Sequence, residues 1–382
     1  MHPFLFRRFR NLETKVHELN YLFWECTQRC NLSCRHCGSD CFASAKDQDM
    51  PLEDFLKALD TIPNPHLSGQ QKKKKAGQNL IVVLTGGEPL LRPDIEQIGQ
   101  EIKKRGYWWS MVSNGFFYTE EMHKKLIRAG LKALTFSLDG IEDTHNWMRG
   151  NSKSYEHTVK AIEIAAKEKY LDLDVVSCVN RRNINQLEEI YQKLSSLGVR
   201  KWRLFTIIPI GRAKEDPDMH LTNQEMVRLM DFIVQKRQTS ETGSNSQTSG
   251  KQASETGSNS QNSCKQALLD VAFSCEGYLG RYEEKVRPVR FFCHAGINIA
   301  SVLIDGRICA CPNIDRDVFS QGNIYQDNLY EVWENKFQVF RNRNWAKKGI
   351  CARCPQFKNC LGGGMHNWHD GPLSCHYRRT GG

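Results

Sequence analysis

The sequence predicts an α/β protein with parallel β/α units, arranged as an open sheet or a partial barrel and followed by a cysteine-rich C-terminal region. Two observations predict this fold class. From about residue 20 to 208, short β-branched or aromatic runs alternate with amphipathic helical stretches. The fifteen cysteines are also clustered, with five between Cys26 and Cys41 and eight from Cys275 onwards.

Six runs are expected as strands, with helices between them. The expected strands are residues 22–25, 80–84, 108–112, 133–137, 173–179 and 202–208. The expected helices are residues 51–62, 94–105, 120–129, 155–167 and 186–197. Ligands of parallel α/β folds gather at the C-terminal ends of the strands, so a functional site is expected there.

Composition is ordinary for a globular protein and sets limits on function. The chain has 382 residues, 40% of them hydrophobic and 25% charged, enough for two domains or one barrel with an appendage. No apolar run approaches the ~20 residues of a membrane span, and the N-terminus has no signal-peptide core, so the cytoplasm is expected. The net charge of +10 is consistent with a nucleic-acid or acidic partner, but part of it comes from a lysine run at residues 72–75.

Residues 238–265 contain a 14-residue duplication rich in Ser, Thr, Gly, Asn and Gln. A segment without apolar residues cannot bury a core, so we expect a disordered linker between the two parts of the chain. Cys264 lies in this linker and is excluded from any metal site. The expected organisation is an N-terminal extension (1–20), a β/α domain (21–215), a connecting helix (216–237), the linker and a cysteine-rich domain (266–382).

Cys30, Cys34 and Cys37 follow the first expected strand in the run CNLSCRHC. Thiolates select soft metals, and three of them without a fourth ligand predict an iron–sulfur cluster with one open iron. The alternative is that the three cysteines are small core residues on one helix face. Asn31 and Ser33 are poor helix formers, which favours the cluster.

Three further motifs follow strands at the same expected edge. Gly86-Gly87-Glu88-Pro89 combines two small residues, which allow close approach of a ligand, with a carboxylate that can bind an amino group. The other two motifs are Ser113-Asn114-Gly115 and Ser137-Leu138-Asp139-Gly140. Their common edge predicts a single site.

These residues resemble the radical S-adenosylmethionine (SAM) superfamily, whose two signatures are the Cys-x3-Cys-x2-Cys and Gly-Gly-Glu-Pro motifs. The resemblance implies a partial (β/α)6 TIM-like barrel and a 4Fe–4S cluster on Cys30, Cys34 and Cys37 that binds SAM and cleaves it to a 5′-deoxyadenosyl radical. It further implies that the SAM-binding residues are Gly86, Gly87, Glu88, Pro89, Ser113, Asn114, Ser137, Asp139 and Arg149. Arg149 would pair with the SAM carboxylate, and the loop at Pro209–Ala213 would lie near SAM.

The C-terminal part resembles the SPASM extension, which carries two auxiliary 4Fe–4S clusters in radical SAM enzymes that modify peptides and proteins. The matching cysteines are Cys293, Cys311, Cys351, Cys354, Cys360 and Cys375. By this resemblance the last four complete one cluster. The other lacks its late ligand because Gly364 stands at that position, so its presence is in doubt; Cys309 is a further candidate ligand, and Cys275, His294 or His366 are possible replacements. A zinc site is the alternative for the late cysteines.

The function expected from the resemblance is modification of a peptide or protein by hydrogen abstraction, with a flavodoxin- or ferredoxin-like electron donor as a further partner. Pro312 replaces the Asp that acts as the base in sulfatase-maturing relatives; Asp315 and Asp317 are nearby, and the base stays unassigned. An RNA-modifying radical SAM enzyme is the alternative, although no RNA-binding module is visible. An alternative of another class is a zinc-binding scaffold protein.

Overall fold

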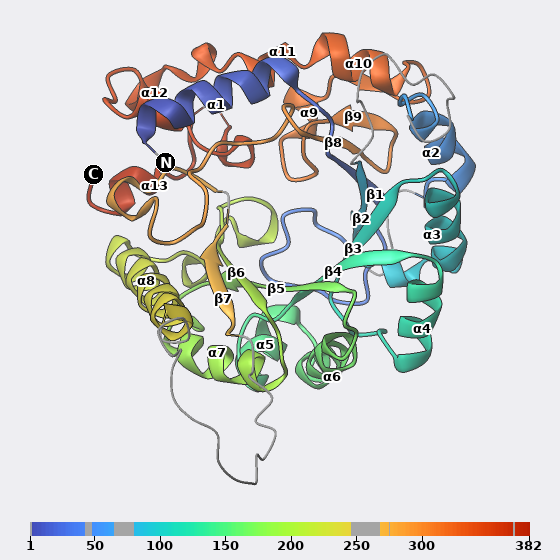
Figure 1. Ribbon diagram of the computed structural model, residues 1–382, viewed down its shortest axis with the longest axis horizontal. Helices are drawn as coiled ribbons and strands as arrows, with labels where there is room; N and C mark the ends of the chain where they lie inside the picture. The colour runs from blue at the N-terminus through green and yellow to red at the C-terminus, as the bar shows by residue number, and fades with distance from the viewer. Residues whose placement is uncertain (1, 43–47, 65–79, 246–267, 275, 370) are drawn as a thin grey trace, which may run out of the picture.

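The computed structural model describes residues 2–42, 48–64, 80–245, 268–274, 276–369 and 371–382. The lysine run at 72–75, Cys275 and most of the duplication, with Cys264, lie outside the described residues. Ten strands of the described chain form one sheet in the order β10-β9-β8-β1-β2-β3-β4-β5-β6-β7. Strands β1 to β6 are parallel neighbours in sequence order, which confirms the expected partial (β/α)6 barrel (Figure 1).

The six barrel strands and the helices around them fall close to the predicted positions. The strands are β1 (Tyr21–Thr27), β2 (Ile81–Gly86), β3 (Trp108–Ser113), β4 (Leu131–Ser137), β5 (Asp172–Val179) and β6 (Lys201–Thr206). The helices on the outer side are α2 (Leu52–Leu59), α3 (Ile95–Lys104), α4 (Glu120–Arg128), α6 (Ser154–Ala166) and α7 (Leu187–Ser196). Each helix covers the sheet with an apolar face; the ring of Phe55 on α2, for example, stacks on Trp24 of β1 at 4.0 Å.

The C-terminal part adds strands to both edges of this barrel. Strand β7 (Asp270–Phe273) pairs in parallel with β6, and β8 (Ile299–Val302) pairs in parallel with β1. Strands β9 (Arg307–Cys309) and β10 (Gly322–Asn323) continue from β8 in antiparallel order. The domain boundary expected at residue 266 therefore does not divide the sheet, because strands from both sides of it pair in one sheet.

The remaining C-terminal chain is mostly short helices, which run from the β8–β10 side to helix α8 (Asn223–Asn245), beside which α13 lies (Figure 1). They are α9 (Arg316–Phe319), α10 (Leu329–Lys336), α11 (Gln338–Arg341), α12 (Phe357–Cys360) and α13 (His376–Arg379). Many aromatic side chains fill the space beneath them, including Trp333, Phe337 and Phe340, each at most 1% exposed.

Three helices differ from the sequence expectation. The N-terminal extension forms α1 (Pro3–Val16), which packs on the C-terminal part because Arg10 donates to the Lys358 and Asn359 carbonyls. An unpredicted α5 (Glu142–Arg149) follows β4. Helix α8 (Asn223–Asn245) continues past residue 237 into the duplication, which corrects the expected disorder of residues 238–245. Extending an already formed helix costs much less than starting one.

Of the helices in the described ranges, none has the length and apolar character needed to cross a membrane.

Candidate functional site

Cys30, Cys34 and Cys37 lie in an irregular loop after β1. No residue from 30 to 37 is helical, so the alternative of three core residues on a helix face is wrong. The loop begins where the Cys30 N–H donates to the Phe42 carbonyl at 2.9 Å. A turn in which Cys37 N–H donates to the Cys34 carbonyl at 3.2 Å then brings these two residues together.

Each of the three sulfurs meets a hydrogen-bond donor. Asn114 Nδ2 lies 3.9 Å from Cys30 Sγ, and Arg149 Nη1 lies 3.6 Å from Cys34 Sγ. A hydrogen bond from the Cys41 thiol lowers the pKa of Cys37. Burial raises the pKa of Cys30, to about 11, so this thiol stays protonated until a metal binds it. The donors favour thiolates at all three positions, as a metal cluster requires.

The two glycines of Gly86–Pro89 allow two backbones to touch. A side chain at Gly86, whose φ is +129°, would overlap the Thr27 carbonyl, and one at Gly87 would overlap that of Arg29. Both N–H groups at the motif's centre bond back to this segment, from Gly87 to the Thr27 carbonyl and from Glu88 to the Arg29 carbonyl. The motif is therefore locked against the start of the cysteine loop.

The Glu88 carboxylate is fully buried and points inward. It accepts hydrogen bonds from the Leu90 N–H at 3.1 Å, the Ser113 hydroxyl at 2.8 Å and the Asn114 N–H at 2.8 Å. Burial raises the pKa of Glu88 to about 7. Glu88 thus joins the loops after β2 and β3, and the expectation that it offers a carboxylate to an amino ligand is not supported by this orientation. The Ser113 hydroxyl also accepts from the Gly115 N–H.

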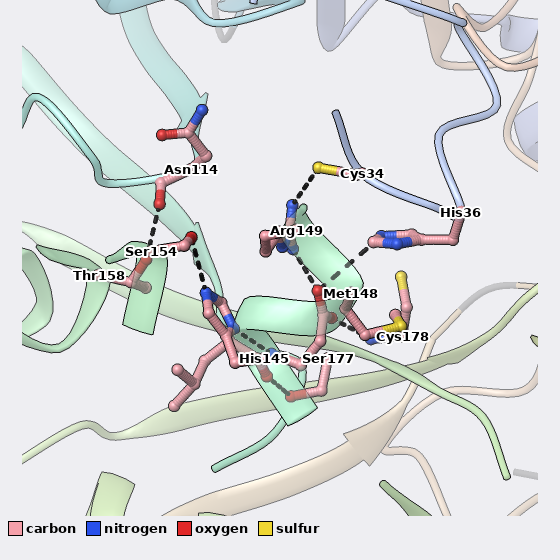
Figure 2. Close-up of polar contacts among 12 residues, drawn as sticks. Cys34, His36, Asn114, His145, Met148, Arg149, Ser154, Thr158, Ser177 and Cys178 are labelled. Carbon is pink, nitrogen blue, oxygen red and sulfur yellow. Dashed lines mark hydrogen bonds and ion pairs between the residues drawn. The ribbon is translucent and has the colours of Figure 1, made fainter. Parts of the chain in front are cut away.

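The loop after β4 contributes a buried ion pair. Arg149, in the last turn of α5, lies 2.5 Å from Asp139, and both side chains are nearly inaccessible. Asp139 also accepts from the Cys178 N–H at 2.8 Å, and His36 of the cysteine loop lies 3.8 Å away. Figure 2 shows Arg149 next to Cys34, with His36 and Cys178 beside it. Ser137, the last residue of β4, is half-buried.

Two segments hold the cysteine loop from outside. The Met148 carbonyl of α5 accepts from Arg35 N–H, and Gly150, with φ +65°, lies so close to Ser33 that a side chain would overlap it. Arg212, in the loop after β6, donates from Nε to the Cys34 carbonyl at 2.7 Å and from Nη1 to the Cys41 carbonyl at 3.2 Å. The sequence placed residues 209–213 near SAM, but gave no sign that Arg212 supports the loop backbone.

Three buried nitrogens around the loop have no hydrogen-bond partner among the described residues: Asn31 Nδ2, His36 Nδ1 and Arg149 Nε. Leaving such groups unpaired costs free energy, so they are typical of a site for a polar ligand. Burial lowers the pKa of His36 to about 4, so its imidazole is neutral. His36 was not predicted as a site residue; its position between two cysteines of the motif is the only signal for it in the sequence.

Cys351, Cys354, Cys360 and Cys375 form a second group near α12 and α13. Burial, together with the neighbouring sulfurs of Cys375 and Cys351, raises the pKa of Cys360 to about 12. A cavity of about 460 Å³ is lined by Cys354 and by residues of the loops before α12 and at α13. The four thiols and the adjacent space fit a metal cluster.

The remaining cysteines of the C-terminal part lie along the main core. Cys309 is fully buried in β9, whereas Cys293 and Cys311 are partly exposed at the edge of the core. The Cys293 sulfur accepts from the Met365 N–H at 3.4 Å. Gly364, which stands where the SPASM pattern has a cysteine, therefore lies next to Cys293.

A cavity of about 370 Å³ lies between the cysteine loop and the C-terminal part. Its lining residues are Gly38, Ser39, Pro209, Ile210, Gly211, Lys214, Pro312, Asn313, Ile314, Asp315, Arg316, His366, Trp368, His369 and Leu373. Asp315 Oδ2 lies 3.4 Å from His369 Nδ1 in this wall. Asp317 is mostly exposed and pairs with Arg307 at 2.6 Å, outside the lining.

Parallel strands with a three-cysteine loop at their C-terminal ends, and a second cysteine group beyond, define a metal-cluster α/β protein. The family models identify it further. The Radical SAM superfamily model matches residues 24–194, and the SPASM model, an iron-sulfur cluster-binding domain, matches residues 293–355. The chain therefore carries a Radical SAM domain followed by a SPASM domain.

Two curated relatives illustrate the range of the family. The chain is 25% identical to the AdoMet-dependent heme synthase of Methanosarcina barkeri over 345 residues, which cover 89% of each chain. It is also 25% identical to the mycofactocin maturase MftC of Mycobacterium tuberculosis over 352 residues, covering 90% of this chain and 78% of the relative.

Solved structures share the fold. SuiB of Streptococcus suis, bound to its precursor peptide SuiA, superposes with a TM-score of 0.64 at 15% identity, covering 98% of this chain and 79% of SuiB. The enzyme anSMEcpe with bound AdoMet and the Cp18Cys peptide superposes with a TM-score of 0.66 at 18% identity, covering 95% and 94%. At such low identity the likeness shows the fold alone.

The family implies a 4Fe–4S cluster, SAM and auxiliary iron–sulfur clusters, and the residues present fit the first two. Each sulfur of the cysteine loop has a donor, and unpaired buried nitrogens surround the loop. The group of Cys351, Cys354, Cys360 and Cys375 fits one auxiliary cluster. The Radical SAM and SPASM domains therefore exclude the alternative of a zinc-binding scaffold.

Proposed function

We propose that this protein is a radical SAM enzyme that modifies a peptide or protein by hydrogen abstraction. The observation that carries the proposal is the cavity between the cysteine loop and the SPASM part. Gly38 and Gly211, which pack at the loop, and Asp315 and His369, from the C-terminal part, line the same space. A substrate group in this cavity would lie beside the place where the radical is made.

The residue roles follow from the contacts. Cys30, Cys34 and Cys37 would hold the cluster, which when bound supplies the electron that cleaves SAM to a 5′-deoxyadenosyl radical. Arg149 Nε, Asn31 Nδ2 and His36 Nδ1 are the unpaired groups that would bind SAM. Most of the other residues expected to bind SAM would act mainly by holding the loops in place: Gly86, Gly87, Glu88, Pro89, Ser113, Asn114 and Asp139. Ser137 lies at the C-terminal end of β4, at the same edge of the sheet.

Polar groups in the cavity would bind and deprotonate the substrate. Asp315 caps α9 through the N–H groups of Asp317 and Val318, so its carboxylate is held in one orientation with His369 beside it. We assign the role of the unassigned base to this pair, because an oriented carboxylate–imidazole pair is suited to accept a proton. Pro312, which replaces the base of related maturases, lines the same wall.

A peptide substrate is supported by the mycofactocin maturases among the relatives, which match 90% of this chain. The heme synthases support a second candidate, a tetrapyrrole, because one of them covers 89% of this chain at equal identity. The cavity residue Lys214 would pair with a carboxylate of either substrate. A flavodoxin- or ferredoxin-like donor would supply the electron.

The test uses the anaerobically reconstituted full chain with SAM and dithionite. Release of 5′-deoxyadenosine that is lost in Cys34→Ala would support the radical step, and no release by fully loaded protein would contradict it. The substrate class follows from which probe raises this release and changes mass: peptides of short proteins encoded beside this chain, iron–coproporphyrin, or tRNA. Stimulation by the porphyrin or by tRNA, and not by peptides, would overturn the peptide proposal.

A further inference from the structure

The SPASM pattern expects a cysteine at position 364, and this chain has glycine there. The backbone of Gly364 has φ −68° and ψ 142°, which any residue can adopt, so backbone conformation does not require glycine. Space does. A Cβ atom at position 364 would lie 2.6 Å from Cε1 of His366, 3.1 Å from its Nδ1 and 2.8 Å from the Glu276 carbonyl oxygen.

The imidazole of His366 therefore occupies the space that a cysteine side chain at 364 would use. The ring edge that faces this space carries Nδ1, a nitrogen that can bind iron when the ring is neutral. His366 is thus a partly buried ring whose Nδ1 lies 3.1 Å from where the Cβ of a cysteine at position 364 would be.

The partners of His366 are also suited to a cluster. Met365 N–H donates to the Cys293 sulfur at 3.4 Å, and the buried Arg343 brings a positive charge and a hydrogen bond to the same sulfur. The Cys293 sulfur is thus met by two donors, as each sulfur of Cys30, Cys34 and Cys37 meets one in the N-terminal loop. Pro312, directly after Cys311, lines the 370 Å³ cavity together with His366.

Other replacements fit less well. His294 is engaged elsewhere, because its Nδ1 pairs with Asn298 at 2.9 Å and its ring packs on Phe292 with 3.8 Å between the centroids. Cys309 is fully enclosed by the apolar core. Cys275 lies outside the described residues.

We infer that His366 replaces the missing cysteine and, with Cys293 and Cys311, holds an iron–sulfur cluster at the first auxiliary site. Imidazole ligands replace thiolates in known iron–sulfur centres and raise their reduction potential, so the ligand exchange is chemically sound. The cluster would lie at the wall of the cavity that His366 lines. This inference concerns the cofactor set and does not depend on which substrate the enzyme uses.

The test is the iron content of the full chain, reconstituted anaerobically. The native protein should hold about twelve irons per chain, and His366→Ala and Cys293→Ser about eight each. The double variant His366→Ala/Cys293→Ser should also hold about eight, because both changes remove the same cluster, whereas His366→Ala/Cys375→Ser should hold about four. His369→Ala is the matched control: it lines the same cavity and should retain all of the iron.

Spectroscopy gives an independent readout. Pulsed EPR of the reduced native protein should show nitrogen hyperfine coupling to an auxiliary cluster, and His366→Ala should lose this coupling while keeping the signal of the N-terminal cluster, which shows that the variant is folded. About eight irons in native protein, or full iron content and unchanged coupling in His366→Ala, would overturn the inference. The first result would mean that His366 closes the site rather than ligating a cluster.

Discussion

Arg149 lies 2.5 Å from Asp139 and 3.6 Å from the sulfur of Cys34, so one buried guanidinium connects the loop after β4 with the cysteine loop. The arrangement leaves Arg149 Nε without a partner among the described residues. The positive charge is therefore held by Asp139 while one donor remains for a ligand. If Arg149 binds SAM as proposed, this relationship would couple the stability of the site to SAM binding.

Removing one member of this pair should destabilise the protein strongly. Asp139→Asn leaves Arg149 buried without its counter-charge, and we expect a loss of about 3–5 kcal/mol in the free energy of unfolding, measured by anaerobic denaturant titration.

Arg149→Lys keeps the charge but loses the planar fork of donors, so SAM affinity should fall roughly tenfold to hundredfold. Unchanged SAM binding in Arg149→Lys, measured by calorimetry, would contradict this role.

Glu88 should make stability depend on pH. Its pKa is raised to about 7 in the folded protein from an ordinary value of 4.5, so the folded state keeps a proton that the unfolded state releases between these values. The stability associated with Glu88 is complete below pH 4.5 and is lost as the pH rises through about 7. Glu88→Gln imitates the neutral form and should remove this decline, which is on the order of 2–3 kcal/mol.

The measurement is the free energy of unfolding of both proteins at several pH values between about 5 and 8. The native protein should lose stability over this range relative to Glu88→Gln. Parallel curves for the two proteins would show that Glu88 does not titrate there.

Arg212 should control how firmly the cysteine loop holds its cluster. Arg212→Ala removes the donors to the carbonyls of Cys34 and Cys41, each worth about 1–3 kcal/mol when buried, and should accelerate cluster loss in air or with a chelator. The rate of bleaching of the visible absorption measures this. Arg182→Ala is a suitable control, because that arginine stacks on Trp147 and pairs with Asp218, and within the described part of the chain it makes no hydrogen bond or ion pair with the three cysteines. Equal bleaching in both variants would contradict the role of Arg212.

Asp315 should act in the substrate reaction and not in SAM cleavage. Asp315→Asn should slow substrate modification by about 100-fold or more, while substrate-independent release of 5′-deoxyadenosine stays close to native. Asp317→Asn is the matched control, two residues away and paired with Arg307 outside the cavity lining. Mass spectrometry of the product and chromatography of the nucleoside separate the two steps. An equal loss of both activities in Asp315→Asn would argue for a structural role.

The alternation of apolar runs with helical patterns was enough to predict the six barrel strands, because each strand is buried and flanked by an amphipathic helix. The pairing of β8 with β1 could not be predicted. Ile299–Val302 is only four residues long, and its partner lies almost 280 residues earlier in the chain. Short strands of this kind are defined by tertiary contacts, which carry no local signal.

The candidate site, like the fold, could be predicted from the sequence only in part. The spacing of Cys30, Cys34 and Cys37 indicated a cluster loop, since close thiols have few structural uses outside metal binding. The inward orientation of Glu88 depends on donors from the loop after β3, and the support from Arg212 depends on a backbone carbonyl more than 170 residues away. Neither interaction leaves a pattern within its own segment.

The placement of β7 and β8 has a consequence for how the protein can be divided. These two strands come from the part of the chain after α8, yet they cover both outer strands of the barrel, β6 and β1. A fragment ending after α8 would leave two rows of unpaired N–H and carbonyl groups open to other chains. We expect such a fragment to aggregate, so that the radical-generating half cannot be produced, or exchanged between proteins, without the strands that close its edges.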